Sequence, residues 1–152
     1  QTVMTQLDAA VEAFVERMSR SALTARGSER LAELLRIQRY YATCARQALA
    51  AAPLQLPSAA DAALMEHHQA FVAATQALLS AHDEPAPAGT ALDPQAMEAR
   101  YQALKAAVLA AAASGMLPLA DMETLLGRYS ALRRAVQQAL KARSRLHVQT
   151  AG

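Results

Sequence analysis

The sequence predicts an all-α fold, an antiparallel up-and-down bundle of about five helices, on three observations. Alanine, the strongest helix former, occurs 39 times, whereas glycine, which most β folds need at their turns, occurs five times. Aromatic residues make up only 4% of the chain, and apolar residues recur with helical spacing in five segments. Hydrophobic residues make up 53% of the 152 residues, which is enough for one core and excludes disorder by composition. We therefore expect a single helical domain over residues 1–152.

The first two helices are indicated by apolar residues that recur every three or four positions. The first covers about 2–22. The second covers about 28–52, because Ser28 after Gly27 is a suitable N-cap and the helix ends before Pro53. The apolar stripe of the first helix contains Val3, Leu7, Ala10, Phe14 and Met18, and that of the second contains Leu34, Ile37, Tyr41, Cys44 and Ala48. Each stripe predicts an amphipathic helix with one buried side.

A capping pattern predicts the start of the third helix, which we expect over about 59–81. Ser58 with Asp61 three residues later is a capping box with Asp in the place of the usual Glu. The apolar face of this helix contains Leu64, Met65, Phe71, Val72, Leu78 and Leu79. The segment 83–92 contains two prolines and a glycine and has no hydrophobic period, so we predict a loop there.

Two further helices are expected after this loop. The fourth covers about 94–114, because Asp93 followed by Pro94 is an N-cap with proline at the first helical position, and Gly115 supplies a stop. The fifth covers about 118–146. Its apolar stripe contains Met122, Leu125, Tyr129, Leu132, Val136 and Leu140. Most connections are short, and this favours antiparallel neighbours.

Charge, cysteine content and hydropathy limit the classes of function. The net charge is +2 and both signs are spread along the chain, so we expect no nucleic-acid partner. Cys44 is the only cysteine and cannot form an intrachain disulfide. The longest uncharged stretch is mostly alanine, which is too weakly apolar for a membrane span. The first residue is Gln1, and an amphipathic pattern is already present by Val3, so we expect either a domain cut from a longer protein or a chain whose first residues are absent.

Two pairs of carboxylates have the i, i+4 spacing that can bring two oxygen ligands to one metal on a helix. Glu12 and Glu16 fall on the side opposite Phe14, which is typical of a solvated face. Glu29 and Glu33 fall nearer the apolar boundary, but no histidine or third carboxylate accompanies them in the helix. We therefore expect neither a metal nor a cofactor.

His67 and His68 suggest a phosphotransfer module, since a phospho-accepting histidine often lies on a bundle helix. However, Phe71 and Val72 stand where Lys and Gly would follow a phosphotransfer His68. His68 also falls at the centre of the apolar face. This placement favours a hydrogen-bonded core or interface histidine, whose titration near neutrality would tune packing.

No catalytic motif is present in the sequence. Cys44 lies on the apolar half of its helix, where a thiol is usually inert packing. The chain contains no Gly-x-Ser-x-Gly, no phosphate-binding glycine loop, no HExxH and no paired CxxC. We therefore expect that the protein is not an enzyme.

Arg133 shares a stripe of the fifth helix with Leu126 and Leu140. Its long side chain can cover apolar surface while the guanidinium stays in water. The guanidinium therefore either reaches the edge of the core or faces a partner. In the second case it marks a protein interface or an acidic group.

The run LLRIQRYYATCARQA, Leu34 to Ala48, resembles a helix of the PhoU-like family, in which a similar Leu-Arg-Ile run leads into Glu-Arg-x-x-Asp. The segment MEARYQALKAAVLAAAASGMLPLADMETLLGRYSALRR, Met97 to Arg134, resembles the end of the PhoU-like cytoplasmic region that follows the membrane part of bacterial sodium/phosphate cotransporters. With the first helix, the similarity covers most of the chain. The family's metal-binding carboxylates would fall at Ala42 and Arg46, neither of which can be that ligand, so its metal clusters are expected to be absent.

The resemblance implies a non-catalytic regulatory or assembly domain of a sodium-dependent phosphate transporter-like protein. Its partner would be the transmembrane part of the same protein, at the cytoplasmic face of the inner membrane. We also expect a homo-oligomer, whose working surface is an apolar stripe together with Arg36, Arg39, Arg46 or Arg133. The alternative is a signalling bundle, either a ligand-sensing module or a histidine phosphotransfer module.

Overall fold

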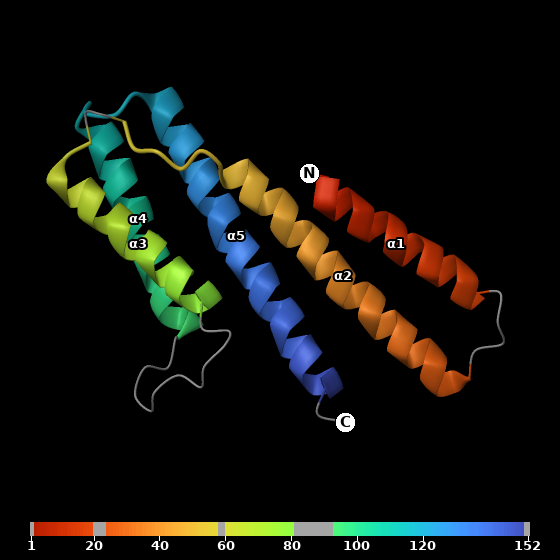
Figure 1. Cartoon of the computed structure of the whole chain (residues 1–152). Helices are drawn as coiled ribbons and strands as arrows, with labels where there is room; N and C mark the ends of the chain where they lie inside the picture. Colours follow the sequence, from red (N-terminus) through yellow and green to blue (C-terminus); the bar gives the residue numbers. More distant parts are fainter. Residues whose placement is uncertain (1, 20–23, 58–59, 81–92, 151–152) are drawn as a thin grey trace.

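Five helices make up the regular structure of the described residues, and no strand occurs among them (Figure 1). This computed structural model describes residues 2–19, 24–57, 60–80 and 93–150. The helices are α1 (Thr2–Ser19), α2 (Ala25–Ala51), α3 (Ala62–Ser80), α4 (Pro94–Ala113) and α5 (Leu119–Thr150). The prediction of an all-α chain with five helices is confirmed. None of these helices has a segment that is both long and apolar enough to cross a membrane.

The start of α2 differs from the expected one. The helix begins at Ala25 because Thr24 is its N-cap, and the Thr24 hydroxyl accepts a hydrogen bond from the backbone N–H of Gly27 with an N–O distance of 3.1 Å. Ser28 lies inside the first turn, so its prediction as the N-cap is wrong. Glycine inside a helix costs about 1 kcal/mol, and a threonine cap contributes about as much in favour of the longer helix.

The start of α4 follows the sequence signal. The Asp93 carboxylate accepts a hydrogen bond from the backbone N–H of Gln95 at 2.8 Å, and Pro94 occupies the first turn. At the other end of α4, Gly115 has a φ of 77°, the left-handed conformation that glycine adopts without strain. These two signals set the length of α4.

At the start of α3, the Asp61 carboxylate accepts a hydrogen bond from the backbone N–H of Leu64 at 2.7 Å. This contact satisfies one of the backbone donors that have no partner within the first turn. Ser58, the other half of the expected capping box, lies outside the described residues. The predicted loop 83–92 lies outside them as well.

Helix α5 buries two different sides. One side carries large residues that join α3 and α4 in the main hydrophobic cluster: Leu125, Tyr129 and Val136. The other side carries four buried alanines, Ala131, Ala135, Ala139 and Ala142, which repeat every three or four positions. Helix α2 packs along α5. The four alanines do not belong to the cluster that α5 shares with α3 and α4, so we assign them to the contact with α2. Small side chains at a contact let two helices approach closely.

The helices are arranged around α5, which lies between the α3–α4 pair and α2 (Figure 1). Helices α2 and α5 run in opposite directions, since Glu33 near the start of α2 contacts Arg145 near the end of α5. Helix α1 lies alongside α2, at the edge of the molecule (Figure 1). No other described helix lies on the far side of α1 (Figure 1).

We predict that Ala135→Leu destabilises the protein, because Ala135 is 4% exposed and a leucine at this position would force α2 and α5 apart. Overpacking of this kind costs about 1–3 kcal/mol of unfolding free energy, measurable by urea denaturation. The matched control is Ala103→Leu on the exposed side of α4, which should change the unfolding free energy by less than about 0.5 kcal/mol. Equal losses in both variants would contradict the prediction.

Candidate interaction surface

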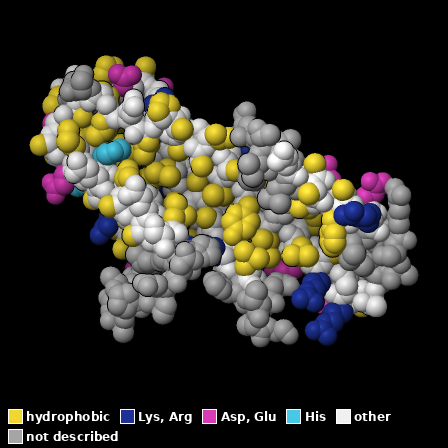
Figure 2. Space-filling view, viewed as in Figure 1, with side chains coloured by type: hydrophobic (Ala, Val, Ile, Leu, Met, Phe, Trp, Pro, Cys, Tyr) yellow, Lys and Arg dark blue, Asp and Glu magenta, His cyan; other side chains and the backbone are white. Residues whose placement is uncertain are grey.

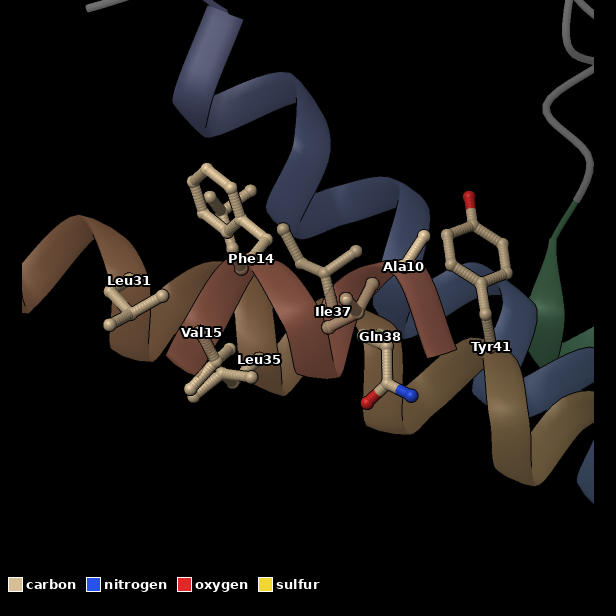
Figure 3. A pocket seen from close by; sticks show the side chains of 10 residues that line it. Ala10, Phe14, Val15, Leu31, Leu35, Ile37, Gln38 and Tyr41 are labelled. Atoms are coloured by element: carbon tan, nitrogen blue, oxygen red, sulfur yellow. The ribbon is translucent and has the colours of Figure 1, made fainter. Parts of the chain in front are cut away.

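A groove of about 310 Å³ lies between α1 and α2 (Figure 3). Its lining is apolar except for the Gln38 amide and the Tyr41 hydroxyl. The lining residues are Ala10, Val11, Phe14 and Val15 of α1, and Leu31, Leu34, Leu35, Ile37, Gln38 and Tyr41 of α2. A groove with so few polar groups is suited to hold apolar side chains and has little to orient a reacting substrate.

The groove stays open because the described part of α1 packs only lightly against α2. Among the described side chains of α1, none is buried. Phe14 is 41% exposed, and on α2 Leu34 is 45% and Leu35 is 37% exposed. Contiguous exposed apolar residues of this size usually mark an interaction site. Figure 2 shows hydrophobic side chains gathered across the middle of one face of the molecule.

Three exposed arginines, Arg36, Arg39 and Arg46, lie on the side of α2 that faces water. Arg36 forms an ion pair with Glu33 at 2.6 Å, and Glu33 also pairs with Arg145 of α5 at 3.0 Å. Arg46 donates a hydrogen bond to the Thr43 hydroxyl at 3.1 Å. The structure thus brings the three predicted residues to one side of α2, and Arg36 shares its partner Glu33 with Arg145 near the end of α5.

Basic residues are concentrated on helices α2 and α5, and acidic residues on the rest of the chain. Helices α2 and α5 carry 11 of the 15 Lys and Arg residues but only four of the 13 Asp and Glu residues. Their formal net charge is +7, and that of the rest of the chain is −5. We did not predict this separation from the sequence, although counting the charges helix by helix reveals it. Only the packing of α2 along α5 makes the two basic helices neighbours.

Arg133 is bound within the chain, between α4 and α5. Its guanidinium forms an ion pair with Glu98 at 2.8 Å and lies 4.5 Å from the centroid of the Tyr101 ring. The Arg133 side chain is 24% exposed, and its Nε atom is buried with no hydrogen-bond partner among the described residues. Arg133 therefore lies at the edge of the core, apart from the three arginines of α2.

His68 lies in an aromatic cluster at the contact of α3 with α5. Its Nδ1 atom is 2.8 Å from the Tyr129 hydroxyl, within hydrogen-bond distance, and the two rings are tilted against each other. Burial lowers the pKa of His68 from 6.5 and raises the pKa of Tyr129 to about 12. The rings of Tyr129 and Phe71 also form a T-shaped pair, and Phe71 is fully buried. His68 therefore contributes to the packing between α3 and α5.

The remaining candidate side chains do not converge. Burial raises the pKa of the Cys44 thiol, so the thiolate that a nucleophile requires is disfavoured. Glu12 and Glu16 are exposed on α1, whereas Glu33 is occupied by two arginines. No group of three or more metal-ligating side chains occurs in the described part of the chain.

Comparisons with protein-family models, with curated proteins and with solved structures find no match for this chain. Its function is therefore inferred from its own residues, from the family resemblance of two segments, and from the α1–α2 surface.

We predict that Arg133→Ala lowers the free energy of unfolding by about 1–2 kcal/mol, because it removes a partly exposed ion pair, a cation–π contact and the packing of the side-chain stem. The neighbouring Arg134 is exposed and provides the control. Arg134→Ala should change the unfolding free energy by less than about 0.5 kcal/mol. Chemical denaturation of both variants measures the difference, and an unchanged Arg133→Ala variant would refute the structural role.

We predict that His68 makes the protein less stable in mild acid. Because burial lowers its folded-state pKa, the unfolded chain binds the proton more readily. The contribution of His68 is therefore present above about pH 6.5 and is lost as the pH falls through its folded-state pKa. Unfolding free energies measured at about pH 7.5 and about pH 5.5 should differ more in the wild type than in His68→Gln. Identical pH dependence would contradict the prediction.

Proposed function

We propose that this protein is a non-catalytic assembly domain that binds a protein partner through the α1–α2 surface. The observation that carries the proposal is the open apolar groove, in which Phe14, Leu34 and Leu35 are all more than a third exposed. A helix pair that served only its own folding would gain by burying these side chains, at about 25 cal/mol per Å². The polar groups needed for chemistry do not converge in this groove.

The resemblance to PhoU-like domains supports a more specific form of the proposal. In that form the chain is an antiparallel up-and-down bundle at the cytoplasmic face of the inner membrane. It regulates or assembles a sodium-dependent phosphate transporter-like protein and contacts its transmembrane part. At the positions of the family's metal ligands this chain has Ala42 and Arg46, so the domain would act through protein contacts without the metal clusters.

The geometry at His68 disfavours the phosphotransfer alternative. One ring nitrogen of His68 contacts the Tyr129 hydroxyl, and burial against aromatic rings lowers the histidine pKa. A phospho-accepting histidine needs an accessible ring nitrogen that a donor protein can approach. His67, its neighbour on α3, is also partly buried.

The proposal is tested by site-specific photocrosslinking in cells that express the full-length gene product. A photoreactive amino acid at Leu34 should form an adduct with an identified membrane-spanning segment of the same protein or with a second copy of this domain. The same group at the exposed Ala63 of α3 is the control and should give none. Mass spectrometry of the adduct identifies the contacted peptide.

Two results would overturn the assembly proposal. The first is the absence of any adduct specific to Leu34 in a chain that also stays monomeric. The second is stable phosphohistidine at His67 or His68 after incubation with a receiver protein that carries an acyl phosphate, a result that establishes the phosphotransfer alternative.

A further inference from the structure

One side of the α1–α2 hairpin carries an apolar strip that the described residues leave partly exposed. In Figure 3 the side chains of Val15 and Leu35 project to one side of the two helices, whereas that of Phe14 projects to the other. On α2 the stripe that contains Leu35 continues to Ala42 and Leu49, at intervals of seven residues, or two helical turns. Leu49 is 62% exposed. The strip therefore extends beyond the groove along the outer side of α2.

The two edges of this strip carry opposite charges. On α1, Glu12 lies one turn before Val15 and is exposed. On α2, Arg39 lies one turn after Leu35 and Arg46 lies two turns beyond Arg39, both also exposed. Helices α1 and α2 as wholes have formal charges of −2 and +3. The strip is thus bordered by an acidic edge on α1 and a basic edge on α2.

The register of the hairpin places Glu12 near the level of Arg39. The groove is lined by residues 10–15 of α1 and 31–41 of α2, so these segments lie side by side. Glu12 falls within the first segment and Arg39 within the second. A two-fold axis parallel to the helices keeps each residue at its own level along the axis. Glu12 of one copy can therefore meet Arg39 of the other copy, and Arg39 of the first can meet Glu12 of the second.

We propose that the occupant of this surface is a second copy of the same chain, with α1 of each copy lying antiparallel along α2 of the other. The two-fold axis then sets the acidic edge of one copy against the basic edge of the other, twice, and buries both apolar strips in a four-helix arrangement. A polyanion would be attracted by α2 but repelled by the acidic edge of α1. This inference rests on the proposed assembly function and names its partner.

A charge swap tests the arrangement, with the monomer–dimer dissociation constant measured by sedimentation equilibrium. Glu12→Arg sets a new guanidinium against Arg39 of the other copy, and Arg39→Glu sets a new carboxylate against Glu12 of the other copy. Each single variant should therefore weaken the dimer at least tenfold. An equimolar mixture of the two variants allows a heterodimer with two attractive pairs. Arg39 of the first variant meets Glu12 of the second, and the two substituted residues meet each other with opposite charges. Its dissociation constant should be within about threefold of that of the wild type.

The control is a variant with the same kind of changes on the other helices, Glu66→Arg with Lys105→Glu, at exposed positions of α3 and α4. It should dimerise as the wild type does. Circular dichroism confirms that each variant keeps its helix content.

Two outcomes overturn this inference: a wild-type chain that stays monomeric up to about 1 mM, or single variants that are weakened but not rescued by mixing. A monomeric chain whose Leu34 crosslinks to a membrane-spanning segment would refute the second copy and leave the assembly function standing. A monomeric chain without any Leu34 adduct would refute both.

Discussion

The two-sided burial of α5 is the constraint on which the rest of the structure depends. Its large side chains, among them Tyr129 and Val136, complete the core with α3 and α4, and its alanine stripe is available to α2. A helix that buries two sides fixes the positions of its neighbours relative to each other. Helix α2 is thereby held where one more of its sides can receive α1, and the remaining side faces water.

This arrangement explains why the candidate surface is on the first two helices. Helices α3 to α5 share one continuous hydrophobic cluster around Phe71, Leu104 and Tyr129. The described part of α1 packs lightly on α2 and buries none of its described side chains, so the apolar residues of that contact stay partly in water. The same packing places the basic helices α2 and α5 together. The molecule therefore combines a closed core with an open, charge-segregated surface.

Much of the fold could be predicted because its signals are local. The cap at Asp93 and the glycine stop at Gly115 act within one turn and are recognisable from the sequence. The N-cap of α2 is not, because Thr24 and Ser28 both carry suitable hydroxyls and Gly27 between them suggests a break. The candidate site was predicted only in part. Arg36, Arg39 and Arg46 do share one side of α2, but their sequence spacing does not reveal that Arg145 lies beside Glu33.

The partners of Arg133 and His68 could not be predicted from the sequence either. Periodicity placed both on apolar stripes, but their partners Glu98 and Tyr129 are 35 and 61 residues away in the chain. The sequence by itself determined the helices, their amphipathic sides and most of their caps, since these depend on interactions between residues within a few positions. The tertiary structure alone decided which basic helices are neighbours, which polar groups are paired, and which apolar side stays open, because each of these depends on contacts between residues far apart in the chain.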